Sequence, residues 1–153
     1  MAEDIKSGVQ PGHETTLEVC ITGRPQDLKT GEYSVIKDLE GCKVGYNGTV
    51  ESWNPMNEKG WQRNAVTGKS LSIACVAKRN FGDAGNDYVA SLKLATGSDC
   101  ETAVRITYPN GDVMYIPCVI NVKNDGADTT ALEQLEFDIL GDGKPEYVAY
   151  QTV

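Results

Sequence analysis

The sequence predicts a mainly β fold, a β-sandwich or half-barrel with one flanking α-helix. In most apolar segments hydrophobic and polar residues alternate, which is typical of strands that bury one face. Only one segment, in the middle of the chain, has its apolar residues at helical spacing. The chain has 153 residues, 40% of them hydrophobic and 24% charged, and this suits one globular domain. We therefore expect a single β domain over residues 17–153, preceded by a flexible arm over residues 1–16.

The first part of the domain is expected to hold three strands and a long loop. The arm has Gly and Pro without periodicity, so it should be loose in a lone monomer. Leu17, Val19 and Ile21 alternate with other residues, as in a half-buried strand. Strands are predicted over residues 17–22, 33–36 and 43–53. Residues 53–69 contain Pro, Asn and Gly together with two Trp, which predicts a loop.

A strand followed by the single helix is expected in the middle of the chain. Residues 70–78 place Leu71, Ile73 and Cys75 on one face of a strand. The spacing of the next apolar residues predicts a helix over residues 86–96, with Asp83 able to cap its start and Gly97 just past its end. The side chains expected to pack on the strand are Tyr88, Val89, Leu92 and Ala95. Those expected to point outward are Asp87, Ser91 and Lys93.

The remaining chain predicts four strands. Asn110-Gly111 lies between two alternating segments, which is a strong signal for a hairpin that joins strands over 102–108 and 112–123. Pro117 lies inside the second of these, so that strand should be at an edge or carry a bulge. The last two strands are predicted over residues 132–139 and 146–152, separated by a Gly-rich turn.

Composition narrows the classes of function. The formal net charge is −8, with 14 Lys and Arg against 22 Asp and Glu and no basic cluster. This argues against binding to nucleic acid through phosphates, and against an anionic membrane surface. We find no signal peptide and no transmembrane segment. The five cysteines are widely spaced without a CxxC motif, so we expect reduced thiols in a cytosolic setting.

No motif in the sequence predicts catalysis, a metal site or a cofactor. His13 is the only histidine and lies in the arm, which makes a histidine-based triad or general base improbable. Thr67-Gly68-Lys69-Ser70 resembles the end of a phosphate-binding loop, but that motif needs Gly where Arg63 stands. We therefore expect no catalytic residue, no metal and no cofactor.

Two features remain as candidates for function. Residues 124–153 hold seven acids and one base, and Glu136 and Asp138 should share the face of their strand that points away from the core. They are a candidate functional surface, with an ordinary solvated surface as the alternative. Trp53, Met56 and Trp61 lie on the long polar loop, where large apolar side chains either fold back onto the core or contact a partner.

Several segments together resemble a known family. Residues 67–73 and 78–89, then Tyr108-Pro109-Asn110-Gly111-Asp112, residues 119–126, Leu135-Glu136-Phe137-Asp138 and Asp142-Gly143-Lys144-Pro145 are similar to the tail tube (major tail) proteins of bacteriophages and phage-tail-like particles of Gram-positive hosts. The resemblance covers residues 50–150 in pattern and implies a β-sandwich or half-barrel with one flanking helix.

The resemblance also implies a function by self-assembly. Six subunits would form a ring, rings would stack into a tube, and DNA would pass through it without specific binding. Other tail proteins would be partners at the tube ends, with assembly in the bacterial cytoplasm and a final place in the virion tail. Residues 1–16 and the loop 53–66 would become ordered only in stacked rings, with Trp53, Met56 and Trp61 as inter-ring contacts and Glu136 and Asp138 facing the lumen. The main alternative is a β-sandwich module of a larger particle that binds the host or a carbohydrate, and an enzyme comes third.

Overall fold

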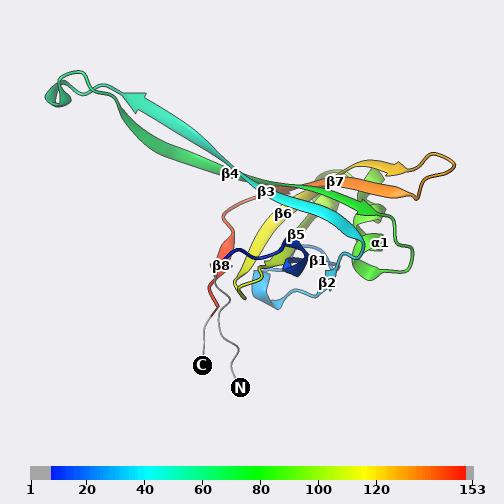
Figure 1. Cartoon of the computed structure of the whole chain (residues 1–153). Helices are drawn as coiled ribbons and strands as arrows, with labels where there is room; N and C mark the ends of the chain where they lie inside the picture. Colours follow the sequence, from blue (N-terminus) through cyan, green and yellow to red (C-terminus); the bar gives the residue numbers. More distant parts are fainter. Residues whose placement is uncertain (1–7, 151–153) are drawn as a thin grey trace.

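The computed structural model describes residues 8–150, and this part of the chain forms one curled antiparallel sheet with one α-helix beside it (Figure 1). The mainly β fold with one flanking helix is thereby confirmed. The helix is α1 (Ala84–Ser91). The strands are β1 (Thr16–Cys20), β2 (Tyr33–Val35), β3 (Leu39–Trp53), β4 (Arg63–Lys78), β5 (Glu101–Thr107), β6 (Val113–Gly126), β7 (Gln134–Gly141) and β8 (Glu146–Val148).

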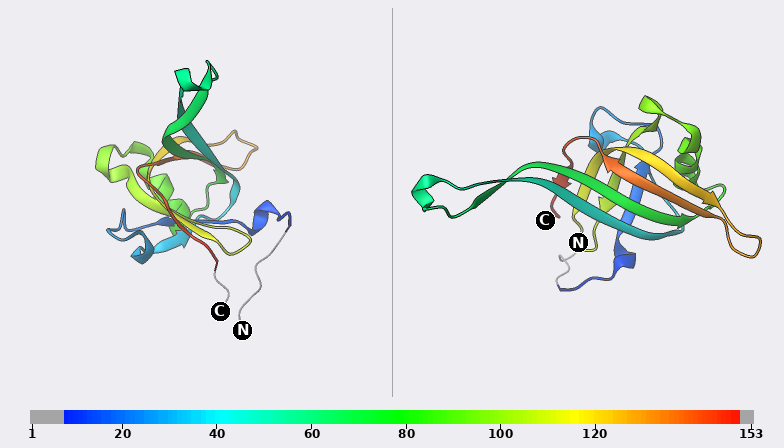
Figure 2. Two further views of the ribbon diagram at one scale, coloured as in Figure 1. Left: turned by 90° about the vertical axis from the view of Figure 1, so that its left-hand side faces the viewer. Right: turned by 90° about the horizontal axis from the view of Figure 1, so that it is seen from above.

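All strands belong to a single sheet with the order β2-β1-β5-β6-β7-β4-β3, and β8 pairs with β6. Every pairing between neighbours is antiparallel. The sheet curls on itself (Figure 2), so its inner face can enclose a core without a second sheet. The half-barrel is therefore the form that the predicted class takes here.

The core is built from alternate residues of the central strands. In β7, Leu135, Phe137 and Ile139 are fully buried, as the alternation of the sequence predicted. They belong to one cluster with buried residues of β1, β4, β5, β6 and α1. Full burial of an aliphatic or aromatic side chain contributes about 1.5–3 kcal/mol, so this cluster is the main source of stability.

Strand β6 is central, so the edge position that Pro117 suggested is wrong, but β6 does carry an irregularity of the β-bulge kind, between Val122 and Asn124. Pro117 pairs with Ala103 of β5 on one side, and on the other side it lies where the partner of β6 changes. There β6 pairs with β7 from Cys118 onward and with β8 up to Tyr115. The Pro117 carbonyl accepts from the Asp142 amide at 2.8 Å, so the ring nitrogen also faces this turn. A proline is tolerated because no ladder hydrogen bond is needed from its nitrogen at this point.

The predicted helix is present, but its bounds differ from the predicted residues 86–96. The α-helix α1 starts at Ala84 and ends at Ser91, and Leu92–Leu94 continue it as a 3-10 turn. Asp83 caps the start as predicted, because its carboxylate accepts a hydrogen bond from the backbone N–H of Asn86 at 3.0 Å. All four predicted inward residues lie in the core cluster or pack against it. The strands nearest to α1 are β1, β2 and β6, so β4 is only part of the shared core. Gly85 permits this approach, since a Cβ there would lie 2.5 Å from the Val35 carbonyl oxygen.

A buried amide holds the start of α1 against two strand ends. Asn86 is fully buried, and its side-chain oxygen accepts from the Arg79 guanidinium and from the Asn80 amide, both at 3.0 Å. Its nitrogen donates to the carbonyls of Lys37 at 3.2 Å and Lys78 at 2.8 Å. Arg79 also pairs with Asp87 at 2.7 Å. The segment 78–89, which carried part of the family resemblance, is therefore a capping and packing motif.

The largest difference from expectation concerns the long loop over residues 53–69. Its second half is strand, because β4 begins at Arg63 and pairs with β3 as far as Trp53. Together β3 and β4 form a hairpin that extends well beyond the sheet (Figure 1). Gly68 and Asn64 suggested a loop, but the pairing continues past them, with one irregularity between Thr49 and Val50. The extra residue in β4 at that point is Thr67, as in a β-bulge.

The remaining expectations need smaller corrections. Asn110-Gly111 forms the predicted turn, with Gly111 at φ 97°. The last strand ends at Val148, and residues 151–152 of its predicted range lie outside the described residues. Residues 1–7 of the predicted arm also lie outside them, while Gly12–Glu14 form a 3-10 turn just before β1. All five cysteines are free thiols, and only Cys42 is not buried.

Candidate assembly surfaces

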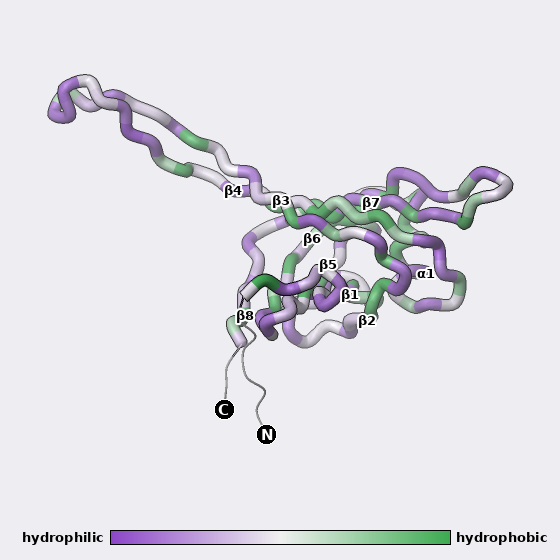
Figure 3. The backbone as a smooth tube through the Cα atoms, in the orientation of Figure 1, coloured by the Kyte–Doolittle hydropathy of each residue, from purple (hydrophilic) through white to green (hydrophobic). Residues whose placement is uncertain are grey.

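The outer part of the β3–β4 hairpin has no core of its own. None of the residues from 47 to 70 is buried. Three of these residues are basic and two are acidic, in a chain of net charge −8. Hydrophilic and hydrophobic residues are interspersed along the whole length of the hairpin (Figure 3). Cross-strand hydrogen bonds pair the backbone groups that face the neighbouring strand, whereas the outward-facing backbone groups and the side chains are available to a partner.

The apolar side chains of the hairpin lie on both of its faces. Val50 and Val66 face each other across the strands and remain 55% and 60% exposed. Trp53 is paired with Arg63 on the opposite face, and the guanidinium carbon lies 5.6 Å from its ring centroid. Large apolar side chains are thus exposed on both faces of a hairpin without a core, which makes the hairpin a candidate contact surface.

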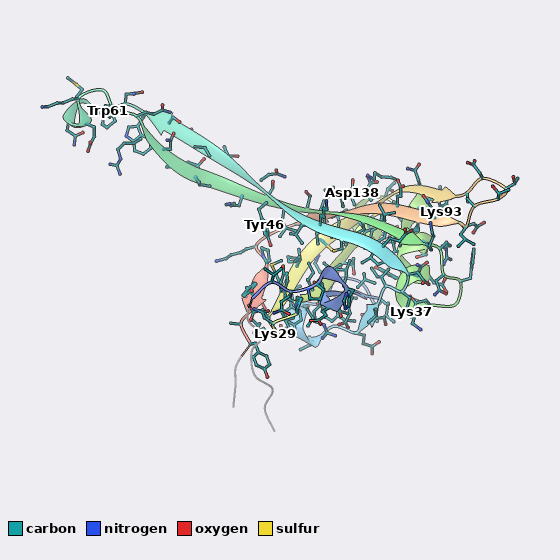
Figure 4. The ribbon with its side chains drawn as sticks, in the orientation of Figure 1. Lys29, Lys37, Tyr46, Trp61, Lys93 and Asp138 are labelled. Atoms are coloured by element: carbon teal, nitrogen blue, oxygen red, sulfur yellow. The ribbon has the colours of Figure 1, made fainter. Side chains whose placement is uncertain are left out.

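At the tip, an ordered turn presents two large apolar side chains to solvent. The turn is fixed by hydrogen bonds, including Lys59 N–H to the Met56 carbonyl at 3.1 Å and the Asn54 amide group to the Gly60 carbonyl at 2.8 Å. Met56 is 96% exposed and Trp61 is 78% exposed, and Figure 4 shows Trp61 at the far end of the hairpin. The structure therefore brings Trp53, Met56 and Trp61 together at one end of the molecule, away from the core.

Glu136 and Asp138 lie on the face of β7 opposite the core, as expected. Their strand neighbours Leu135, Phe137 and Ile139 are buried. Asp138 forms an ion pair with Lys123 at 3.3 Å, and Glu136 accepts from the Asn124 side chain at 3.1 Å. Both carboxylates thus have a partner within the same subunit: a positive charge for Asp138 and a hydrogen-bond donor for Glu136.

The surrounding face of the sheet is close to charge balance. Lys43, Ala74 and Asp138 lie in one row across β3, β4 and β7. Lys78 of β4 pairs with Glu40 at 3.1 Å. The strongly acidic composition of residues 124–153 therefore does not translate into an equally acidic sheet face, because lysines from other strands lie beside the acids.

A carboxylate clamp attaches the C-terminal segment to the β5–β6 turn. Asp112 accepts from the Tyr147 hydroxyl at 2.5 Å and from the Tyr150 amide at 2.7 Å. The hydrogen bond from Tyr147 holds the pKa of Asp112 below its usual value. The same bond raises the pKa of Tyr147 to about 12. Tyr147 also lies beside the half-buried Tyr108, with ring centroids 6.3 Å apart.

Two grooves accompany these surfaces. One, of about 670 Å³, is lined by residues 12–17 and 35–43, where the start of β1 approaches the start of β3. The other, of about 450 Å³, lies between α1 and the β6–β7 connection. Within residues 8–150, no group of three or more His, Cys, Asp or Glu side chains is placed to hold a metal ion. No helix in the same range is long and apolar enough to span a membrane.

The fold is one that solved particle tails also contain. A chain in the tail of an empty gene transfer agent particle, computed with helical refinement and C6 symmetry, is similar with a TM-score of 0.72 and 13% identity. A chain in the virion of a native gene transfer agent particle is similar with a TM-score of 0.71 and 14% identity. Both matches cover 92% of this chain and 100% of the other. The sequence matches no protein-family model and no curated protein.

The apolar residues of the tip could be singled out from the sequence, but the β3–β4 hairpin that carries them could not. The signal was present, since Asn54-Pro55 and Lys59-Gly60 are turn pairs between two segments that contain Val and Thr. Phe81 was not among the candidate residues either. Its side chain is 72% exposed, and the guanidinium carbon of Arg79 lies 4.2 Å from its ring centroid. An isolated aromatic in a Gly-rich loop gives no periodicity from which exposure can be inferred.

Proposed function

We propose that this chain is a structural subunit of the tail tube of a bacteriophage or phage-like particle. Six copies form a ring, rings stack into a tube, and DNA is delivered through it. The observation that carries the proposal is the shared fold over 92% of this chain with a tail that has C6 symmetry. The exposed apolar hairpin adds support, because such a surface is expected where copies of one chain contact each other.

In this proposal the hairpin connects successive rings. Trp53, Met56 and Trp61 are exposed on the part of the hairpin that projects beyond the sheet. Large aromatic and Met side chains are enriched at the centres of protein interfaces. Other tail proteins cap the two ends of the tube, and no cofactor takes part. Subunits assemble in the cytoplasm of the bacterial host and end in the virion tail.

The assembly is tested on the purified full chain by sedimentation and electron microscopy. Rings with six-fold symmetry and tubes of increasing length at higher concentration are the expected result. A chain that remains monomeric at millimolar concentration, with no ring or tube at any salt concentration, contradicts the proposal. The same result favours the second candidate, a β-sandwich module that binds the host or a carbohydrate through the exposed Trp53 and Trp61.

We further propose that Glu136 and Asp138 face the lumen and limit the attraction of DNA to the wall. Replacing both by Lys adds positive charge beside Lys123, and each ring repeats the change once per subunit. Tubes should still form, because both side chains lie on a solvated face. DNA should leave particles that carry the variant more slowly, and most slowly at low salt, where screening is weakest.

A matched control separates lumen charge from net charge. Glu32→Lys with Asp99→Lys makes the same change in net charge at two exposed positions on other elements. This control should release DNA at the parent rate. If the Glu136→Lys, Asp138→Lys variant releases DNA as fast as the control at every salt concentration, the two acids do not face the path of DNA.

A further inference from the structure

The two ends of strand β4 carry two different exposed surfaces. Its first residue, Arg63, adjoins the hairpin tip, and its last residue, Lys78, is followed by Arg79 and, two residues further on, by Phe81. These two residues line the 450 Å³ groove beside α1. Figure 4 shows Trp61 at one end of the molecule and Lys93, which also lines this groove, at the opposite end. The tip and the groove are therefore separated by the full length of the sheet.

The groove has the size and lining of a site for large side chains. Its volume of about 450 Å³ lies within the range of pockets that enclose a drug-sized group, about 300–1,000 Å³. Phe81 on its wall is 72% exposed, and Leu132 in the neighbouring β6–β7 connection is 73% exposed. The residues that line the groove are Arg79, Phe81, Asp87, Ala90, Ser91, Lys93, Asp125, Gly126 and Glu133.

The charges of the two surfaces are complementary. Residues 124–133 are the end of β6 and its connection to β7. They carry Asp125, Asp128 and Glu133 and no basic residue. Asp125 is paired with Lys93 at 3.2 Å, whereas Asp128 and Glu133 have no ion pair within the described part of the chain. The tip over residues 54–63 carries Lys59, Arg63 and one acid, Glu58, which leaves one excess positive charge. Lys59 has no ion pair among the described residues and lies in a left-handed turn conformation with φ 55°.

We propose that the groove between α1 and the β6–β7 connection receives the hairpin tip of a second copy of this chain. Trp61 and Met56 pack against Phe81, and Lys59 lies against the acidic connection at Glu133. The inference rests on the proposed self-assembly and adds the acceptor surface to it. Because the donor and the acceptor are different surfaces, the contact is heterologous, and because they lie at opposite ends of the sheet, we expect it to repeat along one direction without closing. A contact of this kind produces a stack.

The larger groove is a less suitable acceptor for this tip. It is lined by Lys37, Lys43 and His13 as well as by Asp38 and Glu40, so it offers no excess of negative charge to Lys59. Among its lining residues, the exposed large apolar side chain is Val35, which is 44% exposed. Neither aromatic stacking nor charge favours the tip at that position.

Charge reversal with rescue tests the pairing in the full chain. Lys59→Glu alone and Glu133→Lys alone should each shorten the tubes at least tenfold in electron micrographs, since each contact between rings repeats the pair once per subunit. The double variant should restore tubes toward the parent length. Lys29→Glu and Glu32→Lys make the same changes at exposed sites outside both surfaces and should leave tube length unchanged. All variants should keep the thermal midpoint of the parent subunit.

A mixing experiment tests the polarity of the contact. One variant, Trp61→Ala with Lys59→Glu, lacks a functional tip, and the other, Phe81→Ala with Glu133→Ala, lacks a functional groove and offers no lysine to the altered tip. Rings of each variant alone should not stack. Mixed rings should pair once and stop, because only one tip and one groove remain compatible. Leu94→Ala, an 89% exposed apolar residue outside this groove, is the control and should stack like the parent.

The outcomes distinguish this inference from the proposed function. If the parent chain forms no rings or tubes, the proposed function fails. If the parent forms tubes and the Glu133→Lys and Phe81→Ala variants form them equally well, the proposed function stands and the groove is not the acceptor. Rescue of Lys59→Glu by Asp38→Lys or Glu40→Lys, and not by Glu133→Lys, would instead assign the tip to the larger groove and overturn the proposal.

Discussion

The start of α1 and the tip of the β3–β4 hairpin place their side chains in opposite environments. At the helix, Asn86 is fully buried and makes four hydrogen bonds to two strand ends and the Arg79 side chain. At the tip, an equally ordered turn leaves Met56 and Trp61 almost wholly in water. The first region is stabilised entirely by contacts within one chain, whereas the second presents its largest side chains outside that chain.

The comparison separates residues that make the subunit from residues that are available to its neighbours. Changes near α1 should lower the free energy of unfolding of the monomer and affect assembly only through it. Changes at the tip should leave the monomer intact and affect assembly directly. The following predictions test that separation, beginning with the largest expected loss of monomer stability.

Asn86→Ala should have the largest effect. It leaves the Asn80 backbone N–H and the Lys37 and Lys78 carbonyls without their partner at part-buried sites. An unsatisfied buried group costs about 1–3 kcal/mol, and three part-buried groups together should lower the free energy of unfolding by about 3 kcal/mol in urea titrations. Ser91→Ala, on the exposed side of the same helix, is the control and should change it by less than about 1 kcal/mol. Equal stability of the two variants would mean that the amide network does not hold the helix.

Leu92→Ala should have the next largest effect. Leu92 is 8% exposed and belongs to the core cluster. Large-to-small changes in a core cost about 2–5 kcal/mol, and we expect the low end because Leu92 lies at the margin of the core. Leu94→Ala, two residues away and 89% exposed, is the matched control. A loss that is the same for both variants would contradict the packing described for this turn.

The Asp112 clamp should affect only the attachment of β8. Replacing Tyr147 by Phe should speed hydrogen exchange of the β8 amides, with exchange in β7 unchanged. The clamp also predicts a pH dependence, because the pKa of Asp112 is lowered in the folded state. Its contribution is present above the usual carboxyl value of 3.8 and is lost as the pH falls through the lower folded value.

The alkaline limit of the same clamp follows from Tyr147. Its pKa is raised from 10.0 to about 12, so its contribution is complete below pH 10 and is lost as the pH rises through 12. The protection factors of the β8 amides, in which the intrinsic pH dependence of exchange is removed, should therefore fall only at the acid end between pH 3 and 10. Fast exchange of β8 at neutral pH in the parent chain would contradict the clamp.

Trp61→Ala should have the smallest effect on the monomer. The side chain is 78% exposed, and its removal should change the free energy of unfolding by less than about 0.5 kcal/mol. The same change should block tube growth at concentrations where the parent assembles, which sedimentation would show. A large loss of monomer stability would place Trp61 against its own core and end the contrast between the two regions.

Elements with clear periodicity could be predicted from the sequence. The alternation of Leu135, Phe137 and Ile139 identified a buried strand face, and Asp83 identified the start of the helix. Both signals are local, because the period of a strand and the capping of a helix depend on residues close together in the chain.

What could not be predicted depends on residues that are far apart in the sequence. The extension of β4 back to Arg63 depends on pairing with β3 and is hidden by Gly68 and Asn64. The neutralisation of Asp138 depends on Lys123, which comes from the adjacent strand β6. The proposed acceptor groove combines α1 with the β6–β7 connection, and no single segment carries its pattern.

The length of β4, which continues through its bulge at Thr67, sets the distance between the hairpin tip and the groove. Its 16 residues, at up to about 3.3 Å each, span at most about 50 Å. If the tip of one copy meets the groove of the next, the axial spacing of a stack is set by counting residues in one strand. Two residues added to both β3 and β4 would lengthen that spacing by up to about 7 Å, while a single residue added to each would turn the tip onto its other face.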